Sequence, residues 1–102
     1  MDNRLELQSR LESIIGNKNV YFQPPASIKL SYPCVIYNIG SGDVKYADDK
    51  AYRYTYSYEI TFIYKRPTLG IIEQMLSEFQ MCKLSRVFTN DNLNHYVFSL
   101  YF

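Results

Sequence analysis

The longest regular pattern in the chain is an alternation of large apolar or aromatic residues with polar residues between positions 52 and 64. The side chains at every second position are Tyr52, Tyr54, Tyr56, Tyr58, Ile60, Phe62 and Tyr64. Because successive side chains of a β-strand point to opposite faces of a sheet, the pattern predicts one long strand with an aromatic face and a polar face. Only Ile63 departs from it. A shift of one residue would turn the aromatic face over, so we expect a well-defined register.

Helical spacing of apolar residues occurs on both sides of this strand. Residues 2–15 are expected to form an amphipathic helix that ends at Gly16. A second helix is expected over residues 69–80, with Thr68 as its N-cap. The apolar face of the second helix combines Ile71, Ile72, Met75, Leu76 and Phe79.

Shorter apolar segments predict the remaining strands, at residues 20–22, 34–39, 85–89 and 95–102. The polar segment 90–94 is typical of a turn between the last two strands. Strands joined by hairpins favour a largely antiparallel sheet, and each helix needs an apolar surface to cover. We therefore expect an α+β fold, a two-layer sandwich with two helices on one face of the sheet. Residues 1–102 are expected to form a single domain.

Acidic and basic residues nearly cancel, giving a net charge of +1. A dedicated nucleic-acid-binding protein usually carries a basic excess, because the release of counterions supplies much of its affinity. The N-terminal residues do not resemble a signal peptide, and no apolar run approaches the roughly 20 residues of a transmembrane helix. We therefore expect neither a membrane partner nor a specific nucleic-acid partner.

The residues with chemically reactive side chains are widely spaced. Cys34 and Cys82 have no CxxC spacing, and His95 is the only histidine. A structural zinc site needs about four ligands, and a catalytic cysteine needs an activating partner, for which there is no local support. The thiols are expected to be reduced, as in a cytoplasmic protein, and buried by packing. We expect no enzyme activity, no metal and no cofactor.

A polar segment, residues 41–51, separates two of the predicted strands. It is longer than the 2–5 residues of a usual hairpin turn, and long loops in small domains often have a function. Asp43, Asp48 and Asp49 lack the alternating spacing and the closing glutamate of a calcium loop. Neither a P-loop nor a dinucleotide-binding glycine pattern follows Gly40-Ser41-Gly42. A solvated loop is therefore the expectation for this segment.

The tyrosine stripe has two interpretations. Aromatic side chains exposed on a sheet can stack on the bases of single-stranded nucleic acid. Alternatively, the stripe forms the core beneath the two helices, which is our expectation for most of its residues. Tyr52 and Tyr54 lie near the predicted loop, where they would be available to a partner.

Several short motifs resemble a known protein family. Tyr21-Phe22-Gln23-Pro24-Pro25 is followed by Tyr32-Pro33-Cys34-Val35-Ile36-Tyr37 and by Tyr46-Ala47-Asp48. Lys65-Arg66-Pro67 then ends the long strand, and an alternating aromatic strand follows His95. Together these motifs resemble the tail-completion (tail-terminator) and head–tail joining proteins of tailed phages and prophages, which are often described as minor capsid proteins.

The resemblance implies a structural protein of the virion neck that assembles in the host cytoplasm. It implies a homo-oligomeric ring, commonly a hexamer, that terminates the tail tube and contacts both the tail-tube protein and the head-closure or connector protein. In such rings the long loop reaches neighbouring subunits or the tube, which here assigns the protein interface to Lys45, Tyr46, Asp48, Asp49, Lys50 and Tyr52. The alternatives are a module that binds single-stranded nucleic acid through an aromatic sheet face, and a small regulatory subunit of another complex.

Overall fold

The alternating segment lies at the centre of the sheet. In the computed structural model, which describes residues 3–46 and 54–102, it forms strand β3 (Tyr54–Tyr64). Strand β2 (Cys34–Tyr46) pairs with one side of β3 and strand β5 (Leu93–Tyr101) with the other, both antiparallel. The β-strand prediction for this segment is thus confirmed from Tyr54 onward, whereas Tyr52 lies outside the described residues.

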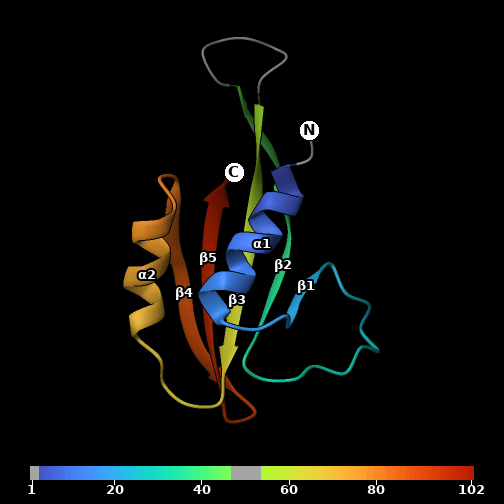
Figure 1. Cartoon of the computed structure of the whole chain (residues 1–102), viewed down its shortest axis with the longest axis vertical. Coiled ribbons are helices and arrows are strands. Elements are labelled where there is room, and N and C mark those ends of the chain that lie inside the picture. Colours follow the sequence, from blue (N-terminus) through green and yellow to red (C-terminus); the bar gives the residue numbers. More distant parts are fainter. Residues whose placement is uncertain (1–2, 47–53) are drawn as a thin grey trace.

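Two strands form the edges of the five-stranded sheet, whose order is β1-β2-β3-β5-β4 (Figure 1). Strand β4 (Cys82–Asn90) is antiparallel to β5. Strand β1 (Val20–Phe22) is parallel to β2, so the sheet is mixed but mostly antiparallel. The predicted α+β class is confirmed.

Both helices cover the same face of the sheet, as predicted (Figure 1). Helix α1 (Asn3–Ile15) ends at Gly16, whose φ of +82° is an angle that glycine adopts readily. Helix α2 (Gly70–Glu78) is shorter than the predicted helix over residues 69–80.

The predicted N-cap of α2 is wrong. Leu69 occupies the cap position without a side-chain hydrogen bond, and the Thr68 hydroxyl donates instead to the Arg66 carbonyl at 2.9 Å. At the other end Phe79 has extended backbone, and its N–H donates to the Met75 carbonyl at 3.2 Å. α2 therefore begins without a side-chain cap.

The core lies between the helices and the sheet and contains the residues of the stripe whose burial is described. Tyr58, Ile60 and Phe62 of β3 are buried there. Neighbouring strands and the two helices complete this cluster with Val20, Val35, Tyr37, Tyr96, Phe98, Leu100, Leu7, Leu11, Ile71, Met75 and Phe79. The expectation that most of the stripe packs under the helices is therefore confirmed for the residues whose burial is described.

Ile63, the exception to the alternation, is buried on the opposite face of the sheet. Its Cα register partner on β2 is Cys34, and Val97 of β5 is buried as well. None of these three residues belongs to the cluster beneath the helices. The face without helices, which we call the open face, therefore also has an apolar centre.

The hairpin between β4 and β5 is tighter than the sequence suggested. Only Asp91 and Asn92 lie between the two strands, with φ angles of 54° and 62°. Positive φ at both central residues is what a two-residue type I′ turn requires, and asparagine and aspartate tolerate it. The five-residue turn predicted over 90–94 is thus wrong, because Asn90 belongs to β4 and Leu93 and Asn94 belong to β5.

Candidate functional site

The end of the β2–β3 hairpin projects beyond the rest of the sheet. The pairing of β3 with β5 begins at Ser57 and Tyr101, so residues 54–56 of β3 pair only with β2 in the described structure. Figure 1 shows β2 and β3 continuing past the end of β5. We call this extension the ribbon: residues 44–46 of β2 paired with residues 54–56 of β3. Its Cα register partners are Val44 with Tyr56, Lys45 with Thr55, and Tyr46 with Tyr54.

A large bulge in β2 marks the base of the ribbon. Ile39 is the register partner of Tyr58 and Val44 is the partner of Tyr56, so residues 40–43 of β2 stand opposite Ser57 alone. A Cβ atom added at Gly40 would lie 2.7 Å from Ser57 Oγ and 3.2 Å from the Ser57 carbonyl oxygen. Glycine therefore allows the close approach of the two strands, and bulges of this kind bend a strand and increase its twist.

The bulge corrects the prediction of a loop over residues 41–51. Residues 41–46 belong to β2, and only residues 47–51 of the predicted loop remain outside the described structure. The Gly40-Ser41-Gly42 sequence, which had suggested a turn, is part of the bulge.

The six residues assigned to the protein interface fall into two groups. Lys45 and Tyr46 lie in the ribbon, paired through their backbones with Thr55 and Tyr54. Asp48, Asp49, Lys50 and Tyr52 lie outside the described residues. The structure therefore places two of the six at the projecting end of the hairpin, and their role at an interface stays a prediction.

A polar network attaches α1 to the strand that leads into the ribbon. The buried Tyr37 of β2 donates its hydroxyl proton to Gln8 Oε1 at 2.5 Å, and Arg4 donates to the same hydroxyl at 3.4 Å. Gln8 in turn donates to the Val20 carbonyl of β1 at 3.1 Å, and the Arg4 guanidinium lies 4.6 Å from the centre of the Phe22 ring. These contacts connect α1 to β1 and β2. They also give the buried Tyr37 hydroxyl the hydrogen-bond partners that a buried polar group requires.

Arg10 makes a second set of contacts at the other end of the helical layer. Its guanidinium donates to Glu78 Oε2 at 2.8 Å and to the Glu78 carbonyl at 3.0 Å. The same group lies 4.7 Å from the Phe79 ring centre and 5.5 Å from that of Phe102, and these two rings pack edge to face. Arg10 thereby connects α1, the end of α2 and the residue after β5, which is a structural role.

The thiols have properties opposite to those of catalytic cysteines. Cys34 is fully buried and Cys82 is half-buried, and burial raises the pKa of each thiol to about 11. A nucleophilic cysteine needs a lowered pKa, because the thiolate is the reactive form. His95 stacks on Phe88, with ring centres 4.5 Å apart, and its Nδ1 lies 3.1 Å from the Leu93 carbonyl oxygen. In residues 3–46 and 54–102, no three or more His, Cys, Asp or Glu side chains are grouped so that they could hold a metal ion.

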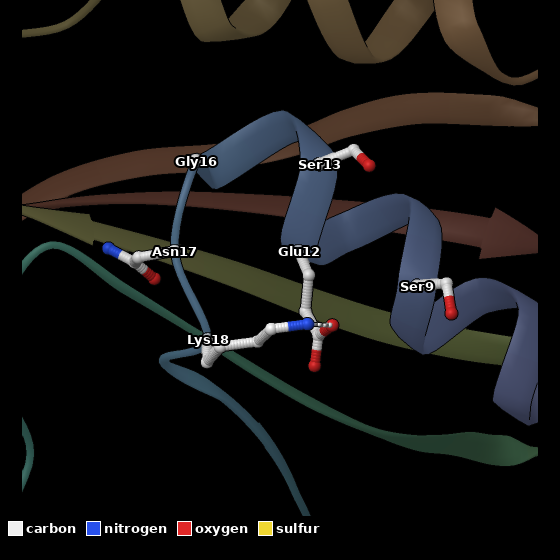
Figure 2. Close-up of a pocket in the computed structure, with 6 residues that line it drawn as sticks. All are labelled: Ser9, Glu12, Ser13, Gly16, Asn17 and Lys18. Carbon is white, nitrogen blue, oxygen red and sulfur yellow. Dashed lines mark hydrogen bonds and ion pairs between the residues drawn. The ribbon is translucent and has the colours of Figure 1, made fainter.

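Figure 2 shows a shallow hollow beside the C-terminal end of α1. Its volume is about 350 Å³, and it is lined by Ser9, Glu12, Ser13, Gly16, Asn17 and Lys18. Lys18 Nζ lies 3.1 Å from Glu12 Oε1, so the two charges neutralise each other. Hydrogen bonds from Gln8 and, to a smaller extent, from Lys18 lower the pKa of the Glu12 carboxyl group. The hollow thus presents small polar groups with balanced charge and no arrangement that favours a particular reaction.

The open face carries an aromatic group that the sequence did not single out. Phe88 of β4 and His95 of β5 are register partners whose rings stack almost parallel, at 11°. The Arg86 guanidinium lies 5.5 Å from the centre of the Phe88 ring, and Phe88 is exposed. The alternation of side chains along the predicted strands 85–89 and 95–102 was the sequence signal that could have placed Arg86, Phe88 and His95 on one face of the sheet.

The exposed apolar residues were also missed. Leu76 was assigned to the buried face of the second helix, but 44% of it is exposed. Besides Leu76, the large exposed apolar residues of the described structure are Leu5, Ile28, Ile39, Leu69, Met81, Val87 and Phe88. A sequence pattern gives the spacing of apolar residues but not which of them the neighbouring elements cover, so this set could be found only in the fold.

No protein family model matches the chain, and no curated protein and no solved structure matches it either. Among the helices of the described residues, neither α1 nor α2 is long and apolar enough to cross a membrane.

Proposed function

We propose that the chain is a structural assembly protein of a tailed-phage neck, where it forms a ring that terminates the tail tube and joins it to the head. The observation that carries this proposal is the ribbon. It extends beyond the sheet and contains Lys45 and Tyr46, two of the residues that the family resemblance assigns to contacts between subunits. A projecting hairpin is suited to reach the next subunit, the tail-tube protein or the head-closure protein.

The chemistry of the described residues supports a binding role over a catalytic one. Burial raises the pKa values of both thiols, and the one ion pair beside the hollow is internally balanced. Binding through surfaces needs neither a nucleophile nor a cofactor. Exposed apolar side chains and a projecting hairpin are the features that protein interfaces use.

The experiment is to remove the ribbon and leave the sheet intact. Residues 41–56 are replaced by a two-residue Asn-Gly turn between Gly40 and Ser57, which face each other at the base of the hairpin. The pairs from Cys34–Ile63 to Ile39–Tyr58 remain, so the melting temperature should change by only a few degrees. We expect the variant to fold but to lose the joining of heads to tails in an assembly assay.

The control changes the hairpin at the other end of the sheet. Replacing Asp91 and Asn92 by Asn-Gly keeps a two-residue turn with positive φ at both positions and should leave both folding and joining unchanged. Normal joining by the variant without the ribbon would contradict the proposed function.

The Arg86–Phe88–His95 group favours a second candidate, a module that binds single-stranded nucleic acid. An exposed aromatic ring beside a guanidinium is a feature on which bases can stack. The tyrosine stripe does not support this candidate, because Tyr58 is buried beneath the helices and so unavailable to bases.

A further inference from the structure

The large exposed apolar residues of the described structure lie at the two opposite edges of the sheet. Five of them, Leu69, Leu76, Met81, Val87 and Phe88, come from α2, β4 and the adjoining segments. We call this side the β4 flank. α2 contacts β4, so Leu69, Leu76, Met81 and Val87 share one side of the molecule, and Phe88 lies on the open face of the same edge strand (Figure 1).

The other three large exposed apolar residues belong to the elements at the opposite edge. Leu5 lies on α1, Ile28 in the connection between β1 and β2, and Ile39 on β2. α1 contacts both β1 and β2. We call this side the β1 flank. An interface with one unrelated protein would need a single apolar side, whereas a head-to-tail contact between copies needs two different ones.

From these two flanks we infer that the β4 flank of one copy binds the β1 flank of a second copy, head to tail. This inference rests on the proposed ring and names the surfaces that would build it. The partner is a second copy of this chain.

The directions of the strands allow such a contact. β4 is antiparallel to β5, β5 to β3, and β3 to β2, so β4 runs antiparallel to β2 and to its parallel neighbour β1. A copy rotated about an axis along the strands keeps these directions and presents β1 antiparallel to β4 of the first copy. The open edge of β4 can then continue its hydrogen bonding, as unpaired edge strands tend to do.

The backbone pairing would be short, and side chains would supply most of the contact. β1 has only three residues and is followed by Gln23, at a φ of 46°, and by Pro24 and Pro25, which cannot donate a backbone hydrogen bond. β4 has nine residues, or about 30 Å at ~3.3 Å per residue, and the molecule is 23 Å thick, so a flank is comparable in size to the ~800 Å² that each partner buries in a standard interface.

Exposed charges accompany the apolar residues on each flank. The β4 flank has Lys83 and Arg86 on the strand and Glu73 on α2. The β1 flank has Lys29 beside Ile28, whereas Glu6 lies on the α2 side of α1 beside Arg10, at 3.9 Å. Lys29 is therefore opposite in charge to Glu73 of the other flank, as expected for the polar rim of a contact between two different surfaces.

The test uses one charged substitution on each flank. Val87→Glu alters the β4 flank and Ile28→Glu the β1 flank. Lys65→Glu is the control, because it changes an exposed charge just after the central strand β3. Circular dichroism melts establish that each variant folds, and Leu76→Glu takes the place of Val87→Glu if the latter melts early. Association is measured by sedimentation velocity and native mass spectrometry from micromolar to millimolar concentration.

We expect the parent chain and Lys65→Glu to form concentration-dependent species larger than dimers. Each flank variant alone should associate at least about tenfold more weakly than the parent, because every head-to-tail contact between its copies contains one altered flank. A mixture of Val87→Glu and Ile28→Glu should form dimers and nothing larger, because one intact flank of each kind remains.

Three results would overturn the inference. The first is a parent chain that stays monomeric at millimolar concentration, and the second is a mixture of the two flank variants that forms no dimers. The third is dimerisation of Ile28→Glu alone, which would indicate a two-fold contact between β4 strands. A chain that associates through these flanks but does not join heads to tails would keep the inference and contradict the proposed function.

Discussion

Tyrosines occupy core positions of this protein because their hydroxyl groups find partners at the edge of the apolar cluster. The Tyr37 hydroxyl donates to Gln8, and the Tyr96 hydroxyl accepts the backbone N–H of Thr68 at 2.9 Å. Each ring therefore contributes a large apolar area without leaving a polar atom unsatisfied. The hydroxyls also connect the sheet to α1 and to the segment before α2, so each tyrosine both packs and positions a helix.

Replacing Phe62 by Ala should destabilise the fold by about 2–5 kcal/mol. Phe62 is fully buried at the centre of β3 and packs edge to face on Phe98, with ring centres 5.8 Å apart. The measurement is chemical unfolding in urea at constant protein concentration. Leu69→Ala is the matched control, because Leu69 is 67% exposed and its loss should cost little. Equal unfolding midpoints for the two variants would show that Phe62 is not part of the core.

Single residues also show the limit of reading burial from sequence. The tyrosine alternation correctly predicted the buried face of β3 because a strand repeats every two residues and leaves no choice of face. The helical pattern predicted that Leu76 and Phe79 share a buried face, yet Leu76 is exposed and Phe79 is buried from an extended conformation beyond the helix. Burial of a short helix depends on which strand it crosses, and the local pattern does not contain that information.

At the scale of elements, local composition misled the prediction for β2. Gly40, Ser41, Gly42 and Asp43 are poor strand formers, and the sequence therefore indicated a loop from residue 41. Pairing with β3 overrides this preference, because the alternating partner strand extends beyond the bulge and offers its hydrogen-bonding edge. The existence and order of the elements could be predicted from the sequence. The extent of β2 and the position of the ribbon could not, since both depend on pairing between distant residues.

Gly40→Ala should destabilise the protein by about 1 kcal/mol, at the lower end of the cost of overpacking. The new Cβ would lie 2.7 Å from Ser57 Oγ, which can rotate away, and 3.2 Å from the Ser57 carbonyl oxygen, which cannot. The measurement is thermal and urea unfolding of the single variant compared with the parent.

A double-mutant cycle with Ser57 checks the cause of the Gly40→Ala effect. Ser57→Ala removes the hydroxyl but leaves the carbonyl oxygen at 3.2 Å, so the double variant should recover part of the lost stability. Strictly additive effects of the two substitutions would contradict a direct contact across the bulge.

At the scale of the whole molecule, charge and burial act together against nucleic-acid binding. The net charge is +1, and Tyr58, Ile60 and Phe62 of β3 face the helices. On the open face, Phe88 lies between Arg86 and His95 in one small group at the β4 edge. Sequence-tolerant binding of single strands uses several stacking rings along a basic groove, which is a larger surface than this group.

We expect binding of single-stranded oligonucleotides to be weaker than micromolar at about 150 mM salt. Fluorescence anisotropy with labelled 12-residue homopolymers of thymidine and adenosine is the measurement, and Phe88→Ala is the companion variant. Micromolar binding by the parent that disappears in Phe88→Ala would make the open face a stacking surface and favour the nucleic-acid module.

The placement of both helices on one face has a consequence for any closed ring of these molecules. If copies meet flank to flank, each turns the same face of its sheet toward the central axis. The bore and the outer wall would then differ in kind, one lined by α1 and α2 and the other by bare strands with Glu59, Thr61 and Ser99 among their side chains. A fold with helices on both faces would instead line both walls with helices. Because this sheet has helices on one face only, the inner and outer surfaces of such a ring would differ even without a bound partner.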